Sequence, residues 1–410
     1  MLDKLNLTKS DSYFEEAKKL SPGGVMGIRR PYNFVVGEYP IFIKEGYGGH
    51  IIDEDGNDYI DMLCAYGPIL LGYVEPEINN EVIKQMSKGF CFSLVQKWQN
   101  ILLKRLTELI PSAEMGILVK TGSDATSCAV RIARGYTKRD KIIRCGYHGW
   151  HDWCVEVHGG IPKKVYEDTL EFHYNDLDSL KKLFAENKDE IACVIITGVG
   201  HALGESVIEP AEGFLEGIKA LCHENKSVFI MDEIRTGFRF GLGGAQKRYG
   251  VTPDLSVFGK ALANGYPIAA VVGKESIMKI AEKEVFISST FFPNSLEMVA
   301  ALKCLEILEK EDVSGKIWER GLAFNKRLEE IVKNVPYEVT VSKVPPMPFV
   351  TFDRDSEGKY KERRTQFYTG AIRRGLFIQP YHHWYISYRH TEADLAKALE
   401  IIEASFKDTY

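Results

Sequence analysis

The sequence predicts an α/β protein whose main domain is a mostly parallel sheet with helices on both faces. Short apolar runs rich in β-branched residues recur between residues 116 and 273, and stretches with helical spacing separate several of them. Continuous apolar strands that alternate with helices are typical of parallel sheets buried on both faces. The runs are GILVK (116–120), KIIRC (141–145), ACVIIT (192–197), VFIMDE (228–233), LSVFGK (255–260) and IAAVVG (268–273).

The segments around this core predict further elements. Residues 11–20 indicate a short amphipathic helix that ends at Ser21-Pro22-Gly23-Gly24. Apolar and polar residues alternate from 39 to 62, and the turn signal Asp55-Gly56-Asn57 lies among them, which predicts hairpin strands. Helices are expected at 75–88, 98–109, 123–136, 176–187, 213–225 and from Pro293 to about Lys310.

The C-terminal part predicts a smaller, mostly antiparallel unit. The segments VPPMPFVTFD (344–353) and GLFIQPYHHWYISYRH (375–390) have the composition of strands. A chain of 410 residues exceeds one ordinary domain. We therefore expect a large domain over residues 61–305, and a small domain that combines an N-terminal segment, residues 1–60, with residues 306–410.

Composition argues against several classes of protein. A formal net charge of -5 provides no basic stripe for nucleic acid or for a membrane surface. No apolar run approaches the roughly 20 residues that span a bilayer, and the polar N-terminus lacks the apolar core of a signal peptide. The eight cysteines form no CxxC pair, which favours buried, reduced thiols over disulfides or a metal cluster. These features predict a cytoplasmic protein.

Three predicted strands are followed by groups that suit one cofactor, pyridoxal phosphate (PLP). In such sheets, ligands bind outside the carboxyl ends of the strands. Asp232 could hold the proton on the ring nitrogen, and Lys260 could supply a neutral amine for the aldehyde. The helix start at 121–125 could bind the phosphate through its N–H groups. Taken one at a time, these groups could equally be a plain N-cap, an ion pair and a solvated lysine. Their occurrence in this order at three strand ends is more specific to a cofactor site.

Longer motifs give the chain a specific resemblance. They are SPGGV (21–25), DEDGNDYIDM (53–62), YGPILLG (66–72), TGSDAT (121–126), RIARGYTKRDKII (131–143), GYHGWHD (146–152), DEIRTGFR (232–239), TPDLSVFGKALANGYPIAA (252–270) and STFFPNSLEMVAA (289–301). With these motifs the chain resembles the class III aminotransferases, a PLP-dependent family of fold type I. The similarity is greatest to the glutamate-1-semialdehyde aminomutase branch, and it extends from about Ser21 to the C-terminus.

The resemblance implies roles around the cofactor ring. Lys260 would form the Schiff base with PLP and would carry the proton between the substrate carbon and the cofactor. Asp232 would pair with the pyridine nitrogen. Tyr147 would stack on one ring face, and Ile234 would press on the other. His148, next to the stacking tyrosine, is expected to be structural rather than catalytic.

The resemblance also implies contacts with phosphate and with substrate. Gly122 and Ser123 would hold the phosphate, and Thr290 would reach the phosphate of a neighbouring subunit, so the active sites would be shared in a homodimer. The aminomutase branch has an arginine near position 30 that binds the substrate carboxylate. Arg30 is the expected clamp, although an alignment shift to the preceding arginine or a plain surface role is the alternative. Tyr66 replaces the usual tryptophan of that branch and is a candidate substrate-binding residue.

The departures from the family pattern lie near the substrate and the polar edge of the cofactor. Thr197-Gly198 occupies the place of a Glu-Pro pair, and His201-Ala202 that of a Gly-Asn pair. The aromatic stretch at 380–387 could line a substrate mouth or pack within the small domain. His382-His383 lacks further ligands at useful spacing, so no metal site is expected. The chemistry is expected to be kept while the substrate differs.

These observations favour a PLP-dependent aminotransferase that moves an amino group from an amine or amino acid to a keto acid or aldehyde. The cofactor would alternate between PLP and pyridoxamine phosphate. The alternative is an intramolecular glutamate-1-semialdehyde aminomutase, with an epimerase of the same family as a third reading. A catalytically silent binding protein is a further hypothesis, but it would have little need for both Lys260 and Asp232.

Overall fold

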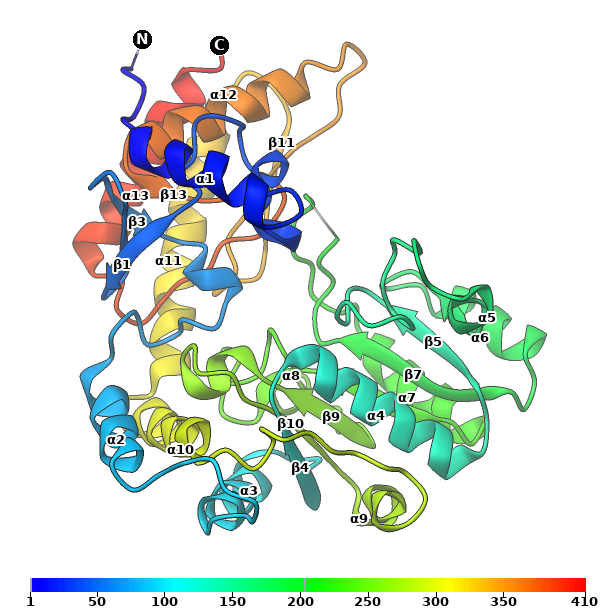
Figure 1. Cartoon of the computed structure of the whole chain (residues 1–410). Helices are drawn as coiled ribbons and strands as arrows, with labels where there is room; N and C mark the ends of the chain where they lie inside the picture. Colours follow the sequence, from blue (N-terminus) through cyan, green and yellow to red (C-terminus); the bar gives the residue numbers. More distant parts are fainter. Residues whose placement is uncertain (1, 203) are drawn as a thin grey trace. The chain divides into compact units, whose positions relative to one another are not determined.

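The computed structural model describes residues 2–202 and 204–410, which form two compact units (Figure 1). The first unit comprises Met1–Glu75, His201–Ile208 and Gly315–Tyr410. The second comprises Pro76–Gly200 and Glu209–Ser314. The chain thus passes between the units after residues 75, 200, 208 and 314, whereas the sequence placed its boundaries after residues 60 and 305.

The second unit is built on a seven-stranded sheet with the strand order β4-β10-β9-β8-β7-β5-β6. β10 runs antiparallel to both of its neighbours, and the other pairs are parallel. The predicted mainly parallel sheet is therefore confirmed. The strands are β4 (Met115–Val119), β5 (Lys141–Cys145), β6 (Thr169–Glu171), β7 (Ile191–Thr197), β8 (Val228–Asp232), β9 (Leu255–Phe258) and β10 (Ala269–Gly273).

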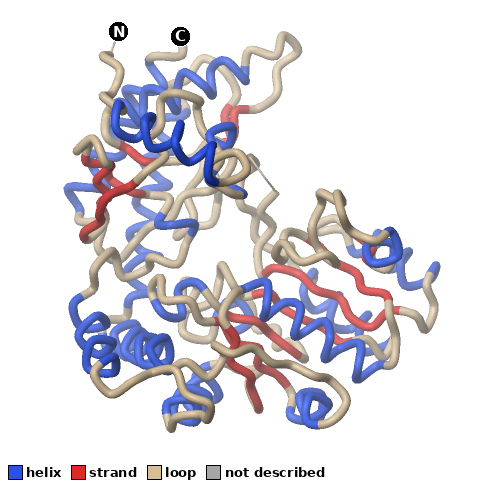
Figure 2. Tube along the Cα trace, viewed as in Figure 1, coloured by secondary structure: helices blue, strands red, loops and turns tan. Residues whose placement is uncertain are grey.

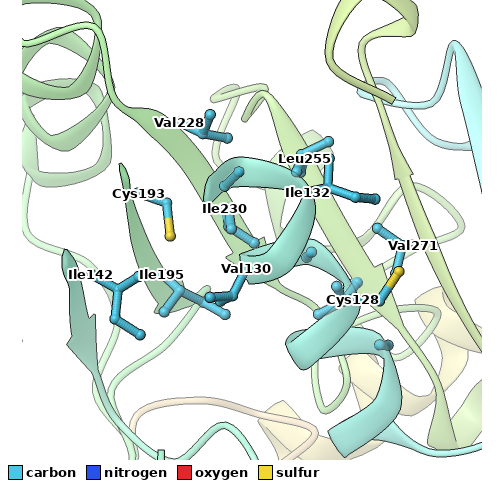
Figure 3. Close-up of a cluster of buried hydrophobic side chains, with 14 of the residues drawn as sticks. Cys128, Val130, Ile132, Ile142, Cys193, Ile195, Val228, Ile230, Leu255 and Val271 are labelled. Carbon is cyan, nitrogen blue, oxygen red and sulfur yellow. The ribbon is translucent and has the colours of Figure 1, made fainter. Parts of the chain in front are cut away.

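Helices cover this sheet because its strands are apolar on both faces. α4 (Gly122–Thr137) packs on β7, β8, β9 and β10, and α7 (Phe214–Glu224) packs on β7 and β8. Figure 3 shows Cys128, Val130 and Ile132 of α4 among strand residues such as Ile195 and Ile230. Burial of each such aliphatic side chain contributes roughly 1.5–3 kcal/mol.

The remaining helices of the second unit flank these elements. They are α2 (Pro76–Met86), α3 (Trp98–Leu109), α5 (Lys163–Glu167), α6 (Leu177–Glu186), α8 (Gly244–Arg248), α9 (Glu275–Met278) and α10 (Ser295–Lys310), with 3-10 turns η4 (Lys260–Ala263) and η5 (Lys279–Glu282). α11 (Val313–Val332) begins at the end of this unit and continues into the first.

The first unit combines both chain ends. Its larger sheet has the order β1-β2-β3-β13, in which β13 pairs parallel to β3. Figure 2 shows these short strands among helices and long loops. The elements are α1 (Thr8–Leu20), η1 (Gly27–Arg29), η2 (Pro31–Asn33), β1 (Ile43–Tyr47), β2 (His50–Asp53), β3 (Asp58–Asp61), η3 (Cys64–Tyr66), β11 (Val339–Val341), β12 (Val350–Phe352), α12 (Tyr360–Arg373), β13 (Leu376–Phe377) and α13 (Glu392–Lys407).

The strands expected at 344–353 and 375–390 form only as the short β12 and β13, and the rest of both segments is not strand. Residues 378–390 are mostly irregular, although Trp384, Tyr385 and Ile386 are fully buried. Their backbone N–H groups donate singly to the carbonyls of Pro348, Met62 and Pro346 rather than to one partner strand. Prolines in 345–348 and at 380 remove ladder donors, so the apolar pattern here reflects burial and not strand structure.

Two further observations bear on the setting of the protein. Among residues 2–202 and 204–410, no helix is long and apolar enough to cross a membrane. All eight cysteines are free thiols, and Cys91 is the exposed one. Burial raises the pKa of several of the others, for example that of Cys193 to about 12.

A histidine held between two carboxylates joins β2 to α13 within the first unit. Nδ1 of His50 lies 3.0 Å from Oδ1 of Asp58, and its Nε2 lies 3.1 Å from Oδ1 of Asp394. Partial burial lowers the pKa of His50, but the hydrogen bonds to the two carboxylates outweigh it, and the net pKa is raised. The charged imidazolium is therefore favoured in the folded state.

This arrangement predicts a pH-dependent part of the stability. Because the folded-state pKa of His50 is raised, its contribution is fully present below the unfolded value of about 6.5 and is lost as pH rises through the folded pKa. We expect His50→Gln to remove at most about 1 kcal/mol at pH 5.5, since the group is partly solvated, and less at pH 8.5. Urea unfolding at both pH values measures this difference. His173→Gln, an exposed histidine of the second unit, is the control; an equal loss at both pH values would contradict the prediction.

Candidate active site

A cavity of about 320 Å³ opens in the second unit at the carboxyl ends of its parallel strands. Segments that follow β4, β5, β8 and β9, together with the last residue of β7, supply its walls. This is the position at which open α/β sheets bind ligands. The lining residues are Thr121, Gly122, Ser123, Tyr147, His148, Gly149, Trp150, Thr197, Asp232, Ile234, Arg235 and Lys260.

The start of α4 forms one wall and suits a phosphate. Thr121 and Asp124 make a reciprocal capping box: the Asp124 N–H donates to Oγ1 of Thr121, and the Thr121 N–H donates to the Asp124 carboxylate. The first-turn N–H groups of Gly122 and Ser123 have no carbonyl partner within the helix and, with the helix dipole, favour an anion.

The Ser123 hydroxyl is oriented by the segment after β5. Its oxygen accepts a hydrogen bond of 3.3 Å from the Trp150 N–H, which leaves the hydroxyl proton available for an anion. Gly149 permits this approach, because a Cβ at position 149 would lie 2.5 Å from Oγ of Ser123. Gly149 also has a φ of 127°, which side-chain-bearing residues rarely adopt. The candidate phosphate site at Gly122 and Ser123 therefore depends on Gly149 as well as on the start of α4.

The cavity walls beside the candidate phosphate site are an aromatic ring and an aliphatic side chain. Tyr147 is about half exposed, at 52%, and Ile234 is partly buried. A Cβ at Gly122 would lie 3.3 Å from Cγ2 of Ile234, so glycine at this position leaves Ile234 its place in the wall. A flat aromatic ligand with a phosphate tail fits between such surfaces.

Asp232, the last residue of β8, is buried and firmly held. Its Oδ1 accepts from the Ile234 N–H at 2.9 Å, and its Oδ2 lies 2.8 Å from Nδ1 of His148. Nε2 of His148 lies 3.1 Å from the Cys145 carbonyl oxygen, so the ring is held between this carbonyl and the Asp232 carboxyl group.

Lys260 lies just beyond β9 and not within it. The strand ends at Phe258, and Lys260 opens η4 with a left-handed φ of 45°. For a residue with a side chain this conformation costs roughly 1–2 kcal/mol, and such strain concentrates at functional positions. Burial lowers the pKa of Lys260 well below its ordinary value; the positive charges of Arg235 and Arg239 add to this, and Asp232 opposes it. Its amine is accordingly favoured in the neutral, nucleophilic form.

Thr290 lies outside this cavity. It is exposed and lines a second hollow of about 710 Å³ in the same unit, formed by the segment before α10 and the segment between α2 and α3.

The other two expected site residues belong to the first unit. Tyr66 lines a cavity of about 340 Å³ together with Arg29, and its hydroxyl donates to the Ile28 carbonyl at 2.9 Å. Arg30 is not among the residues of that cavity; its Nε donates to the Val25 carbonyl at 3.3 Å.

Tyr66 is the third of four consecutive residues with left-handed backbone, and the fourth is Gly67. Cys64, Ala65 and Tyr66 have φ values of 49°, 52° and 68°. Oδ1 of Asp61 accepts from the N–H groups of Leu63 and Cys64 at 2.8 and 3.1 Å, which holds the start of this turn. The conformation of Tyr66 is thus imposed by its surroundings at a cost in local free energy.

Three residues of the cavity, Gly149, Trp150 and Arg235, were given no role from the sequence, and the partner of His148 was not predicted. Arg235 is part of the matched motif DEIRTGFR but had no assigned role. The partnership of His148 with Asp232 spans 84 residues of sequence, so no local spacing signals it.

Local contacts explain why Thr197-Gly198 stands where the family pattern has a Glu-Pro pair. Oγ1 of Thr197 donates to the Val199 carbonyl at 2.7 Å, so this neutral side chain is satisfied within its own turn. A Cβ at Gly198 would lie 2.4 Å from Cβ of Ala245, which leaves no room for a larger residue, proline included.

Comparison with known proteins adds to this geometry. A family model described as aminotransferase class-III matches residues 33–406. The 3-aminobutyryl-CoA aminotransferase of Cloacimonas acidaminovorans is 57% identical over 409 residues, which cover 100% of this chain and 99% of the relative. A glutamate-1-semialdehyde 2,1-aminomutase of Lachnoclostridium phytofermentans is 34% identical, with 97% and 98% covered.

Among solved structures, the FumI protein of Sphingopyxis sp. MTA144 in its PLP internal aldimine form has the same fold. The TM-score is 0.93 at 28% sequence identity, and the match covers 98% of this chain and 96% of that chain. The residues in the cavity described above have the chemistry that PLP requires: an anion-binding helix start, a buried carboxylate, flat and aliphatic walls, and a neutral lysine.

Proposed function

This chain belongs to the class III aminotransferases and is a PLP-dependent aminotransferase, and from that premise we propose that its amino donor is a 3-aminoacyl thioester of coenzyme A, 3-aminobutyryl-CoA. The acceptor in this proposal is a keto acid. The single observation that carries it is the 57% identity, over the whole of both chains, to a protein of that activity. The aminomutase relatives match over a similar length at 34%, so they support the family more than the substrate.

In this proposal PLP, when bound, supplies a ring that accepts the electron pair left on the substrate carbon when it loses its proton. Lys260 would provide the neutral amine that joins the cofactor aldehyde, and the same amine, once free, could take the proton from the substrate carbon and return it. The lowered pKa of Lys260 supports joining the aldehyde and taking the proton, because both need the neutral amine.

The other residues of the cavity would hold the cofactor in place. Asp232 would place a carboxylate against the ring nitrogen, and His148 fixes the orientation of that carboxyl group. Gly122 and Ser123 would bind the phosphate, and Tyr147 and Ile234 would enclose the ring.

Arg30 and Tyr66 remain proposals for the substrate side. In this reading Arg30 binds a carboxylate and Tyr66 contacts the substrate. Arg29, the residue before Arg30, lines the cavity that contains Tyr66. Substitution of Arg29 therefore tests the carboxylate-binding role as directly as substitution of Arg30.

We also propose a homodimer in which Thr290 reaches the cofactor phosphate of a second copy. Thr290 is exposed in a region where large apolar side chains are also exposed, which is typical of interaction surfaces. These side chains are Phe92, Leu94, Val95, Phe286 and Phe291.

Free thiols at all eight cysteines favour a reducing compartment, and we propose the cytoplasm.

The test is a substrate comparison with the purified protein loaded with PLP. We expect 3-aminobutyryl-CoA and a keto acid to give 3-oxobutyryl-CoA and the corresponding amino acid. Free 3-aminobutyrate is the matched control for the thioester, and glutamate 1-semialdehyde without a second substrate tests the aminomutase reading. Equal rates with the free acid would remove the coenzyme A part of the proposal. Consumption of the semialdehyde alone would make the protein an aminomutase.

A further inference from the structure

A polar cavity of about 580 Å³ lies within the first unit, and none of the roles assigned above uses it. Its walls come from the segment 204–208, from β11 and β12, from the start of α12 and from Tyr381. Small-molecule sites are concave and carry a few well-placed polar groups, which is the composition of these walls.

Two of the segments at which the sequence departs from the family pattern meet in this cavity. Gly204 lies two residues after the His201-Ala202 pair, and Tyr381 belongs to the aromatic stretch at 380–387. The Gly204 N–H donates to the Tyr381 carbonyl at 2.9 Å, so these segments are joined although they are far apart in the sequence. Since the departures are expected to follow the substrate, a cavity that unites them is a candidate for substrate recognition.

Hydrogen bonds between segments hold the walls of this cavity in place. Oγ of Ser206 lies 3.0 Å from Oγ1 of Thr351 on β12 and donates to the Thr340 carbonyl on β11 at 3.3 Å. The buried Ser342 donates to the Val207 carbonyl, also at 3.3 Å. The segment 204–208 is thereby fixed to both strands, and the cavity is formed before any ligand enters.

Arg364 and Tyr381 form a stacked pair in the wall. The guanidinium carbon of Arg364 lies 4.5 Å from the centroid of the Tyr381 ring, and its Nη2 donates to the Tyr381 hydroxyl at 3.0 Å. Aromatic rings and guanidinium planes are the surfaces on which nucleic bases stack. The N–H groups of Arg364 that Tyr381 does not engage can bind phosphate oxygens.

The charged residues that line the cavity are two arginines and two carboxylates. Arg354 is exposed at the rim, and Arg364 is partly buried. Asp353 accepts from the Thr340 hydroxyl at 2.8 Å, and Glu205 is exposed. Arginine forks match phosphate groups, whereas carboxylates accept hydrogen bonds from ribose hydroxyls. This mixture suits a nucleotide better than a simple anion.

We propose that this cavity binds the nucleotide end of a coenzyme A thioester, an adenosine with phosphates at its 3′ and 5′ positions. The inference rests on the proposed donor, 3-aminobutyryl-CoA. The base stacks beside Arg364 and Tyr381, and the two arginines bind the phosphates. Such a substrate is held both at its reacting carbon and at its nucleotide, and remote contacts of this kind supply binding energy without joining in the chemistry.

The first experiment measures the dissociation constant of adenosine 3′,5′-bisphosphate from the PLP-loaded protein by calorimetry. Arg354→Gln and Arg364→Gln are each expected to weaken binding about tenfold or more, because each removes a charge-assisted contact with phosphate. Arg327→Gln, an exposed arginine of α11 in the same unit, is the matched control and should bind as the wild type does. Arg354 is exposed, so its variant keeps the test valid if Arg364→Gln folds poorly.

The second experiment measures turnover of 3-aminobutyryl-CoA by the same variants. Loss of a remote contact is expected to raise KM for the thioester about tenfold or more and to leave kcat within about twofold. The half-reaction of the pyridoxamine phosphate form with the keto acid should be unchanged, since the keto acid has no nucleotide. A change in that half-reaction equal to the change with the thioester would show general damage to the enzyme and overturn the inference.

The inference and the proposed function fail in different ways. If the wild type converts the thioester but both arginine variants match Arg327→Gln in dissociation constant and KM, the inference alone is overturned. If the wild type binds the bisphosphate in an arginine-dependent manner without converting the thioester, the proposed donor is wrong and the nucleotide site stands. If it neither binds the one nor converts the other, both are overturned.

Discussion

Replacement of Lys260 by alanine is expected to lower amino transfer by at least about four orders of magnitude. Alanine lacks the amine that joins the cofactor aldehyde and that moves the proton at the substrate carbon, so two steps lose their reacting group at once. Bound cofactor should remain as the free aldehyde, with an absorbance spectrum unlike that of the wild type. Single-turnover kinetics with the amino donor measure the loss directly.

The control for Lys260→Ala is Lys247→Ala, an exposed lysine on α8. It should retain wild-type turnover. The backbone at position 260 keeps a Cβ in the variant, so the left-handed φ of 45° is strained to a similar extent in both proteins. A Lys260→Ala protein that folds normally and still turns over at a tenth of the wild-type rate would refute the assignment of this lysine.

Asp232→Asn is expected to keep the fold and to lose about two to four orders of magnitude in kcat. The amide oxygen can still accept from the Ile234 N–H, but the side chain no longer carries the charge that holds the proton on the cofactor ring. The contact of Oδ2 with Nδ1 of His148 is altered as well. The prediction is measured as kcat together with the thermal midpoint of unfolding.

Asp254→Asn provides the control for Asp232→Asn. Asp254 is also buried; it accepts from the Phe229 N–H and pairs with Lys274, and it does not line the cofactor cavity. We expect this control to lose stability by about 1–3 kcal/mol and to keep its kcat. If the two variants lose kcat equally, Asp232 acts through the stability of the sheet and not through the cofactor.

Most of the second unit was predictable from sequence because its signal is strong and local. The six apolar runs correspond to β4, β5, β7, β8, β9 and β10, since strands covered on both faces must be apolar along most of their length. The three-residue strand β6 was missed, because Thr169–Glu171 has too few residues for a periodic signal. The irregular, buried segment before His390 was mistaken for strands, because burial gives the same composition as a strand.

The residues of the candidate site also differ in whether the sequence alone signals them. Residues at strand ends and at a helix start, such as Lys260 and Gly122, carry local signals, and the structure brings them into one cavity. The pairing of His148 with Asp232 arises only when β5 and β8 take their places in the sheet. The cavity that Gly204 and Tyr381 line likewise forms only when distant segments of the first unit come together. Such relations depend on tertiary structure and leave no pattern in a single sequence.

The left-handed turn at Cys64–Tyr66 limits how the proposed substrate contact at Tyr66 could be redesigned. A protein engineer who exchanges Tyr66 for the aromatic residue of a relative inherits a backbone that Asp61 holds through two N–H groups. The same carboxylate receives the hydroxyl of Tyr73 at 2.6 Å, which ties a third position to the turn. Residues 61–73 should therefore be exchanged together when specificity is transferred from a relative. A library that varies position 66 alone will contain few functional variants.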